Sequence, residues 1–346
     1  MTVFIGGLLF CGIVNAVVDP LFHYHAPIKG LSYSLYDERY QNDGIVRHFT
    51  YDAMITGTSM TENASASLVS ELYDVNCIKT CFRGGSYREI SDNIRTALEN
   101  NPSLKLVIRA TDQFDIISAA DSHISTNPDS GYDYPAYIMD DDILNDVHYI
   151  LGKSFLIDSV TDIKMTIKKT PSTTFDEYMN WDALMQGGKE SVLAGYTRPA
   201  PTGEQTALTD EEREMIKENI QKNIIDLAND YPGVTFMIWI PPYSIAYYDA
   251  YYRAGLLDKS LEAMEIECGM LTGVPNIRLY GYLDRADIVT DFDRFKDLTH
   301  FDERTNNEFL KLMAEDEGLI TSDNMSDYMK RVRDLYTDYD YDRIFE

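Results

Sequence analysis

The sequence predicts an α/β domain in which helices cover a doubly wound, mostly parallel sheet of five strands. Short apolar segments, each ending in turn residues, recur along the chain and are typical of strands buried on both faces. Stretches with helix-capping residues or a helical spacing of apolar residues lie between them. With 346 residues, of which 44% are hydrophobic and 12% aromatic, the chain has enough apolar side chains for a core.

The expected elements alternate along the chain. The strands cover residues 52–57, 76–82, 105–110, 234–240 and 276–280, and the helices cover 86–100, 209–229 and 247–272. Residues 112–205 are rich in proline and polar loops, so we expect them to be an insertion between the third and fourth strands of a domain spanning 50–320. The last segment, 321–346, reads as an acidic, tyrosine-rich tail.

The N-terminal segment is apolar. Residues 3–18 contain no charge and a single polar side chain, Asn15. This approaches the roughly 17–25 apolar residues that cross a bilayer, so we expect a membrane anchor over 1–22 and a polar juxtamembrane linker over 23–49. A buried core helix is the alternative. No basic residue precedes the segment, so the positive-inside rule gives no orientation, and the true start could lie upstream.

Charge and cysteine content exclude several classes of protein. The chain carries 57 acidic and 30 basic residues, a net charge of −27, which excludes a protein that binds the phosphate backbone of nucleic acid. Its four cysteines are too few and too scattered for a disulfide scaffold. Three histidines near the N-terminus and the acidic run 140–142 read as surface polar groups rather than metal ligands. We expect neither a metal nor a cofactor.

Two short segments carry the residue types of nucleophilic catalysis. Ser59 follows the first strand in Gly57-Thr58-Ser59, and a serine on such a strand-to-helix turn is exposed at the carboxyl edge of the sheet. His300 follows the last strand in Asp297-Leu298-Thr299-His300. A carboxylate three residues before an imidazole can fold back onto Nδ1 and leave Nε2 facing a serine. Ser59 is therefore the candidate nucleophile, His300 the base and Asp297 its orienting group.

These segments make the chain resemble the SGNH (GDSL-like) hydrolase superfamily, and most closely the membrane-anchored SGNH-like proteins of bacterial envelope-polysaccharide loci. The segments that carry the resemblance are VDPLFHYHAP, ERYQNDGIVRHF, ITGTSMTEN, FRGGSYREI and DLTHFDERTNNEF. They cover the anchor, the first ~110 residues and about 234–312. The resemblance implies a flavodoxin-like three-layer sandwich, the triad Ser59, Asp297 and His300, and an oxyanion donor from Gly84-Gly85.

The chain departs from the family pattern around the oxyanion hole. Thr58 replaces the aspartate of Gly-Asp-Ser, and Asn63 replaces the usual glycine. Arg109-Ala110-Thr111-Asp112 stands where the family has Gly-x-Asn-Asp, so the usual asparagine donor is missing. Asn63 is the candidate replacement donor. A carboxylate at Asp112 would repel an oxyanion unless it is protonated or turned away.

The expected function is a serine-dependent O-acyltransferase or esterase that acts on acyl groups of a cell-envelope glycan through an acyl-enzyme. The expected partners are that glycan or an acylated small molecule, and the membrane. The expected location is membrane-anchored with the domain outside the cytoplasm. The alternative is a non-catalytic glycan-binding protein or an assembly partner of a membrane-bound acyltransferase. Arg83 and Arg109 could meet an anionic glycan or form internal ion pairs, and Trp239 and Tyr243 could line a pocket or the core.

Overall fold

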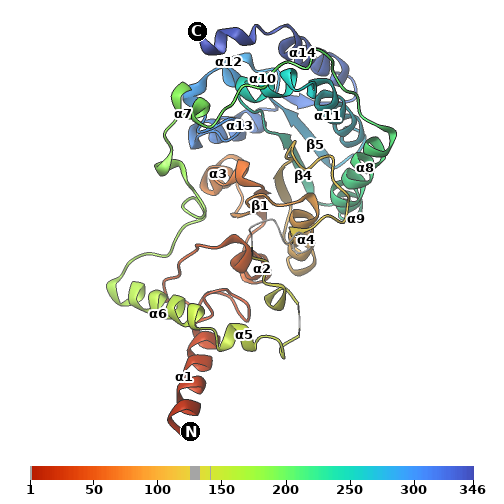
Figure 1. Cartoon of the computed structure of the whole chain (residues 1–346). Helices are drawn as coiled ribbons and strands as arrows, with labels where there is room; N and C mark the ends of the chain where they lie inside the picture. Colours follow the sequence, from red (N-terminus) through yellow and green to blue (C-terminus); the bar gives the residue numbers. More distant parts are fainter. Residues whose placement is uncertain (1, 125–132, 141) are drawn as a thin grey trace.

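A mostly parallel sheet forms the centre of the computed structural model, which describes residues 2–124, 133–140 and 142–346 (Figure 1). The strands lie in the order β2-β1-β3-β4-β5-β6. They are β1 (Ala53–Gly57), β2 (Cys77–Cys81), β3 (Leu106–Ala110), β4 (Thr235–Ile240), β5 (Ile277–Gly281) and β6 (Leu319–Ile320). The first five pair in parallel and β6 is antiparallel to β5. The α/β class and the five predicted strands are confirmed; the two-residue β6 is too short to leave a pattern in the sequence.

Helices cover both faces of the sheet. On one side α3 (Ala66–Tyr73) packs against α13 (Glu303–Ala314), and on the other α4 (Tyr87–Asn100), α8 (Asp210–Ile220) and α11 (Leu257–Leu271) lie together (Figure 1). The remaining helices of this domain are α9 (Asp226–Asp230), α10 (Ile245–Arg253), α12 (Ala286–Val289) and α14 (Met325–Asp338). The strands read as continuous apolar runs because both of their faces are buried.

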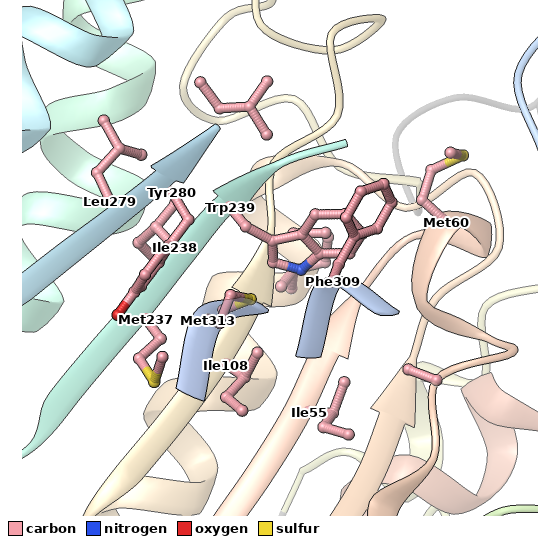
Figure 2. Close-up of a cluster of buried hydrophobic side chains, with 14 of the residues drawn as sticks. Ile55, Met60, Ile108, Met237, Ile238, Trp239, Leu279, Tyr280, Phe309 and Met313 are labelled. Carbon is pink, nitrogen blue, oxygen red and sulfur yellow. The ribbon is translucent and has the colours of Figure 1, made fainter. Parts of the chain in front are cut away.

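Aromatic and aliphatic side chains fill the space beneath α13. The rings of Trp239 on β4 and Phe309 on α13 lie 5.3 Å apart and meet over Ile55 and Ile108 (Figure 2). Trp239 is only 2% exposed, so it belongs to the core and not to a ligand pocket. This packing fixes α13, and therefore the loop that precedes it, against the carboxyl end of the sheet.

The N-terminal segment is a helix, α1 (Thr2–Val18), that projects from one end of the molecule (Figure 1). The Asn15 amide ties its base to the carbonyls of Tyr149, Ile150 and Gly152 at 3.0–3.3 Å. These residues lie at the end of α5 (Val147–Ile150) and before α6 (Lys153–Lys168). Within the described part of the chain, no helix has the length and hydropathy to cross a membrane, so the predicted membrane helix lacks support.

The predicted linker 23–49 is wrong in its second half, which forms α2 (Glu38–His48) and packs against α4 and β2. Ile45 and Val46 on this helix are fully buried. The helix could not be recognised from hydropathy, because its buried face also carries charged and amide side chains. These side chains form hydrogen bonds and ion pairs inside the protein.

One further predicted segment needs correction. The tail 321–346 contains α14, which buries Tyr328, Val332 and Tyr336 at helical spacing. The acidic residues of this segment obscure its apolar face, which is supplied largely by tyrosine rings. The insertion 112–205 holds α5, α6 and α7 (Lys189–Ala194), and the part of it that reaches the sheet contributes residues to the site described next.

Candidate active site

Ser59 begins a short 3₁₀ turn, Ser59–Thr61, directly after β1. Gly57 precedes it with φ +148°, a conformation that side chains rarely adopt, and a Cβ there would lie 2.9 Å from Thr61 Oγ1. Glycine therefore allows the chain to leave the strand sharply. The turn leaves Ser59 half-buried at the carboxyl edge of the sheet, where doubly wound sheets place their ligand sites.

His300 and Asp297 lie beside Ser59 on the loop before α13. Ser59 Oγ is 2.8 Å from His300 Nε2, and His300 Nδ1 is 2.8 Å from Asp297 Oδ2. Asp297 Oδ1 also accepts the backbone N–H groups of Thr299 and His300, both at 2.9 Å. The structure thus brings the three predicted residues into one continuous hydrogen-bonded chain, in the order that a Ser-His-Asp triad requires.

The surroundings of Asp297 favour its ionised form. Burial alone raises the pKa of this carboxyl group, but the hydrogen bond and the charge of His300, together with two backbone N–H groups, outweigh burial and lower the pKa well below its usual range. A carboxylate that stays ionised holds a proton on Nδ1 and keeps Nε2 free to accept one from Ser59.

Trp181, which belongs to the predicted insertion, packs against the imidazole of His300. Its ring lies edge-on to that of His300, with centroids 5.8 Å apart and planes at 89°. Lys296 Nζ covers the indole ring at 4.7 Å. Trp181 therefore limits the positions that the imidazole can take. Sequence reasoning missed it, because one tryptophan in a proline-rich segment carries no motif.

Gly84 and Gly85 lie in the tight turn after β2. The Gly85 N–H donates to Phe82 O at 2.8 Å, so it is not available to a ligand. The N–H groups of Gly84 and Ser59, in contrast, have no acceptor among the residues that the structure describes. Both residues line the same pocket as His300. Of the two predicted glycines, Gly84 is thus the one that can offer its N–H to an oxyanion.

Asn63 is not an oxyanion donor, and its predicted role is corrected. Its side chain is completely buried and absent from the pocket wall. The side-chain amide oxygen accepts the backbone N–H of Trp181 at 3.0 Å, and the side-chain amide nitrogen donates to the backbone carbonyl of Phe301 at 3.4 Å. Asn63 therefore ties the segment that carries Trp181 to the loop that carries His300. The sequence suggested a nearby donor from spacing alone, without showing which way the side chain turns.

Asp112 lies in the pocket wall, one residue after Thr111, which stands at the position of the family's oxyanion asparagine. Thr58 Oγ1 donates to its Oδ2 at 2.7 Å, and the Tyr243 hydroxyl donates to its Oδ1. The carboxylate is thus held on the pocket wall by two hydroxyl groups. Tyr243 is fully buried and packs in the core as Trp239 does, and it supports the pocket wall from behind through Asp112.

The pocket beside Ser59 has a volume of about 300 Å³. Its lining includes Phe114, which is 61% exposed and whose ring packs against that of Tyr243. His123 also lines it, and burial lowers the pKa of this imidazole. The adjoining segment 125–132, which includes the predicted polar loop 125–131, lies outside the described residues.

The other candidate residues do not form sites. Arg109 is 1% exposed and donates to Ser91 and Asn223, so it cannot meet a glycan. Arg83 is half-exposed and pairs with Glu62 at 3.2 Å. Of the acidic run 140–142, residue 141 lies outside the described residues. Within the described ranges no group of three or more side chains could hold a metal ion.

Comparison of the chain with protein-family models, with curated proteins and with solved structures finds no match.

Proposed function

We propose that this protein is a serine-dependent esterase or O-acyltransferase of the SGNH type, with a flavodoxin-like three-layer domain. The observation that carries the proposal is the chain Ser59–His300–Asp297, with 2.8 Å at each of its two contacts. The strand order β2-β1-β3-β4-β5 is the one found in flavodoxin-like sheets and supports the fold assignment.

The geometry supports a two-step reaction. Ser59 Oγ attacks the ester carbonyl while His300 Nε2 takes its proton, and the N–H groups of Ser59 and Gly84 receive the developing oxyanion. The C–O bond to the leaving alcohol breaks as His300 returns the proton to that alcohol, which leaves an acyl-serine. Water or a sugar hydroxyl then gives its proton to His300 and attacks the acyl carbon. The bond from that carbon to Ser59 Oγ breaks as His300 returns the proton to Oγ, which releases an acid or a new ester and regenerates Ser59.

The proposed substrate is an O-acylated glycan of the cell envelope, or an acylated small molecule. The resemblance of the sequence motifs supports the glycan. The net charge of −27 and the carboxylate of Asp112 beside Ser59 make a neutral or zwitterionic substrate easier to bind than an anionic one. Binding that weakens as salt is lowered for an anionic ester, but not for a neutral ester, would match this charge pattern.

We further propose that the protein works at a membrane, with its domain outside the cytoplasm. Helix α1 carries no charge, and Leu9, Phe10 and Ile13 on it are more than 60% exposed. A helix that is apolar all round is normally buried in protein or in lipid. Extraction of the full chain from the membrane fraction by detergent, but not by high salt or carbonate, is the expected result.

One observation favours the alternative, a non-catalytic glycan-binding protein or a partner of a membrane-bound acyltransferase. Thr111, at the position of the family's oxyanion asparagine, is 2% exposed and absent from the pocket wall, and one missing oxyanion donor costs about 10²–10³ in rate. In that case the full chain would bind an acylated glycan without turning over its esters.

The test is the hydrolysis of a small neutral ester such as p-nitrophenyl acetate by the full chain. Ser59→Ala should abolish turnover, while Ser103→Ala, which changes an exposed serine in a turn, should leave it unchanged. Equal turnover by wild type and Ser59→Ala would refute the assignment of Ser59. A wild type that binds an acylated glycan but shows no turnover of its esters would favour the binding function.

A further inference from the structure

Charged residues at the start of α2 contact the turn that carries Gly84. Arg39 is 3% exposed, and its guanidinium donates to both carboxylate oxygens of Glu89 at 2.9 and 3.0 Å. It also donates to Glu38 Oε1 at 3.0 Å and to Arg83 O at 2.9 Å. Glu38 Oε1 in turn accepts the Arg83 N–H at 2.6 Å. Two adjacent residues of α2 thus hold the two backbone groups of Arg83, its N–H and its C=O.

The conformation of this turn determines the direction of the Gly84 N–H. The hydrogen bond from Gly85 N–H to Phe82 O closes a four-residue turn, with Arg83 and Gly84 at its centre. Gly84 has φ +60°, whereas Arg83 is not among the residues with positive φ, which is the pattern of a type II turn. Rotation of the central peptide by about 180° converts a type II turn into a type I turn and reverses the direction of its N–H.

The central peptide of this turn is the one that joins Arg83 to Gly84. It is trans, because the described chain contains no cis peptide, so its C=O and N–H point in opposite directions. Its C=O points at the buried guanidinium of Arg39. Its N–H is the Gly84 donor, which therefore points away from Arg39, and Gly84 lines the pocket with Ser59 and His300.

We infer that Arg39 is a positioning residue for the reaction proposed above: it holds the Arg83–Gly84 peptide in the one orientation that aims the Gly84 N–H at the oxyanion. A charge-assisted hydrogen bond to the C=O of a peptide also polarises that peptide and strengthens its N–H as a donor. Glu89 and Glu38 fix the guanidinium in place, and Glu89 belongs to α4, which begins just after the turn.

The same turn is joined to the nucleophile. Arg83 Nε pairs with Glu62 Oε1 at 3.2 Å, and the Glu62 N–H donates to Ser59 O at 3.4 Å. The turn with the oxyanion donor and the turn with the nucleophile are thus linked by one set of charged groups, which α2 completes. This gives a physical reason for burying Glu38 and Arg39 in a segment that the sequence presents as a polar linker.

The test rests on the proposed function, and compares Arg39→Gln and Arg39→Lys with the matched control Arg88→Gln in the full chain. Arg88 is a half-exposed arginine on α4 that pairs with Asp92 and does not contact the turn. With p-nitrophenyl acetate, Arg39→Gln should lower kcat by about 10–100-fold, part of the 10²–10³ attributed to one oxyanion donor, and leave KM within about threefold. Arg39→Lys keeps the buried charge, and therefore the fold, but cannot form the guanidinium fork, so it should show the same fall in kcat.

A rescue experiment separates positioning from a general loss of structure. In Arg39→Ala, millimolar ethylguanidinium should restore kcat, whereas ethylammonium at the same concentration should not. Equal kcat in Arg39→Gln, Arg39→Lys and Arg88→Gln would overturn the inference. Equal rescue by the two cations would also overturn it.

A readout without turnover makes the two proposals separately testable. In protein labelled with ¹⁵N-glycine, the amide signal of Gly84 should shift in Arg39→Gln and stay in place in Arg88→Gln. If wild type shows no Ser59-dependent turnover, the proposed function fails, and the Gly84 signal alone then decides whether Arg39 orients the peptide. An unchanged Gly84 signal in Arg39→Gln would contradict the inference even in an active enzyme.

Discussion

Replacing Asp297 by asparagine changes the triad at one atom. In Asp297→Asn the amide oxygen can still accept the N–H groups of Thr299 and His300, which Asp297 Oδ1 accepts at 2.9 Å. The loop should therefore keep its shape. The amide NH₂ now faces His300 Nδ1, which must become the acceptor, so the imidazole proton moves to Nε2. In that tautomer Nε2 cannot accept the proton of Ser59.

The expected loss follows from the exposure of the carboxylate. In buried triads this replacement lowers kcat by about 10⁴-fold. Here the Asp297 side chain is 44% exposed, so water takes over part of its stabilisation of the imidazolium ion. We expect a fall in kcat of about 10²–10³-fold, equivalent to about 3–4 kcal/mol at 1.36 kcal/mol per factor of ten.

The assay is the hydrolysis of p-nitrophenyl acetate between pH 5 and 9, with circular dichroism as the check on folding. Asp293→Asn is the control, since it removes the same charge from an exposed position on the same loop. It should retain wild-type kcat. Activity of Asp297→Asn within threefold of wild type would refute the reasoning, and an equal fall in both variants would show that loop charge alone is responsible.

Three further predictions concern stability. Burial and the charge of Glu62 raise the pKa of Glu38 from 4.5 to about 7, so the folded protein holds a proton that the unfolded chain has lost, and the free energy of unfolding should fall as pH rises from about 4.5 to 7. In urea titrations at several pH values, Glu38→Gln should make the free energy of unfolding less dependent on pH. The same pH dependence in wild type and Glu38→Gln would contradict the raised pKa of Glu38 beside Glu62. Gly57→Ala should lower the free energy of unfolding by about 1–3 kcal/mol because φ +148° strains any side chain. Asn63→Ala should lower it by a similar amount, about 1–3 kcal/mol, by leaving the Trp181 N–H unpaired; a large fall in rate with unchanged stability would instead restore an oxyanion role.

The strands and the triad positions could be predicted from the sequence because they depend on short-range patterns. Buried parallel strands are apolar on both faces, so β1 and β3–β5 stand out as runs such as Phe236–Ile240. Alternation with helices then predicts parallel strands, whose carboxyl ends bring the residues after β1 and β5 to one edge of the sheet. That is enough to place Ser59 and His300 near each other without any knowledge of side-chain directions.

The predictions that were wrong concern residues whose interaction partners are distant in the sequence. Helix α2 can carry a charged residue on its buried face because Arg39 forms an ion pair with Glu89, fifty residues away in the sequence. Asn63 turns inward because Trp181 offers it an N–H from a segment without any motif. Hydropathy counts such residues as exposed, since it cannot show that a buried charge is paired. The same limitation made 321–346 read as a tail.

The most direct measurement of the central claim is labelling of the full chain by a serine-reactive fluorophosphonate, mapped by mass spectrometry. His300 Nε2 lies 2.8 Å from Ser59 Oγ, where it can take the serine proton. We therefore expect wild type to carry the label on the peptide that contains Ser59, and Ser103→Ala to label equally. Ser59→Ala should not label. A wild type that stays unlabelled, or a Ser59→Ala protein that labels as well as wild type, would contradict the assignment of Ser59 as a nucleophile.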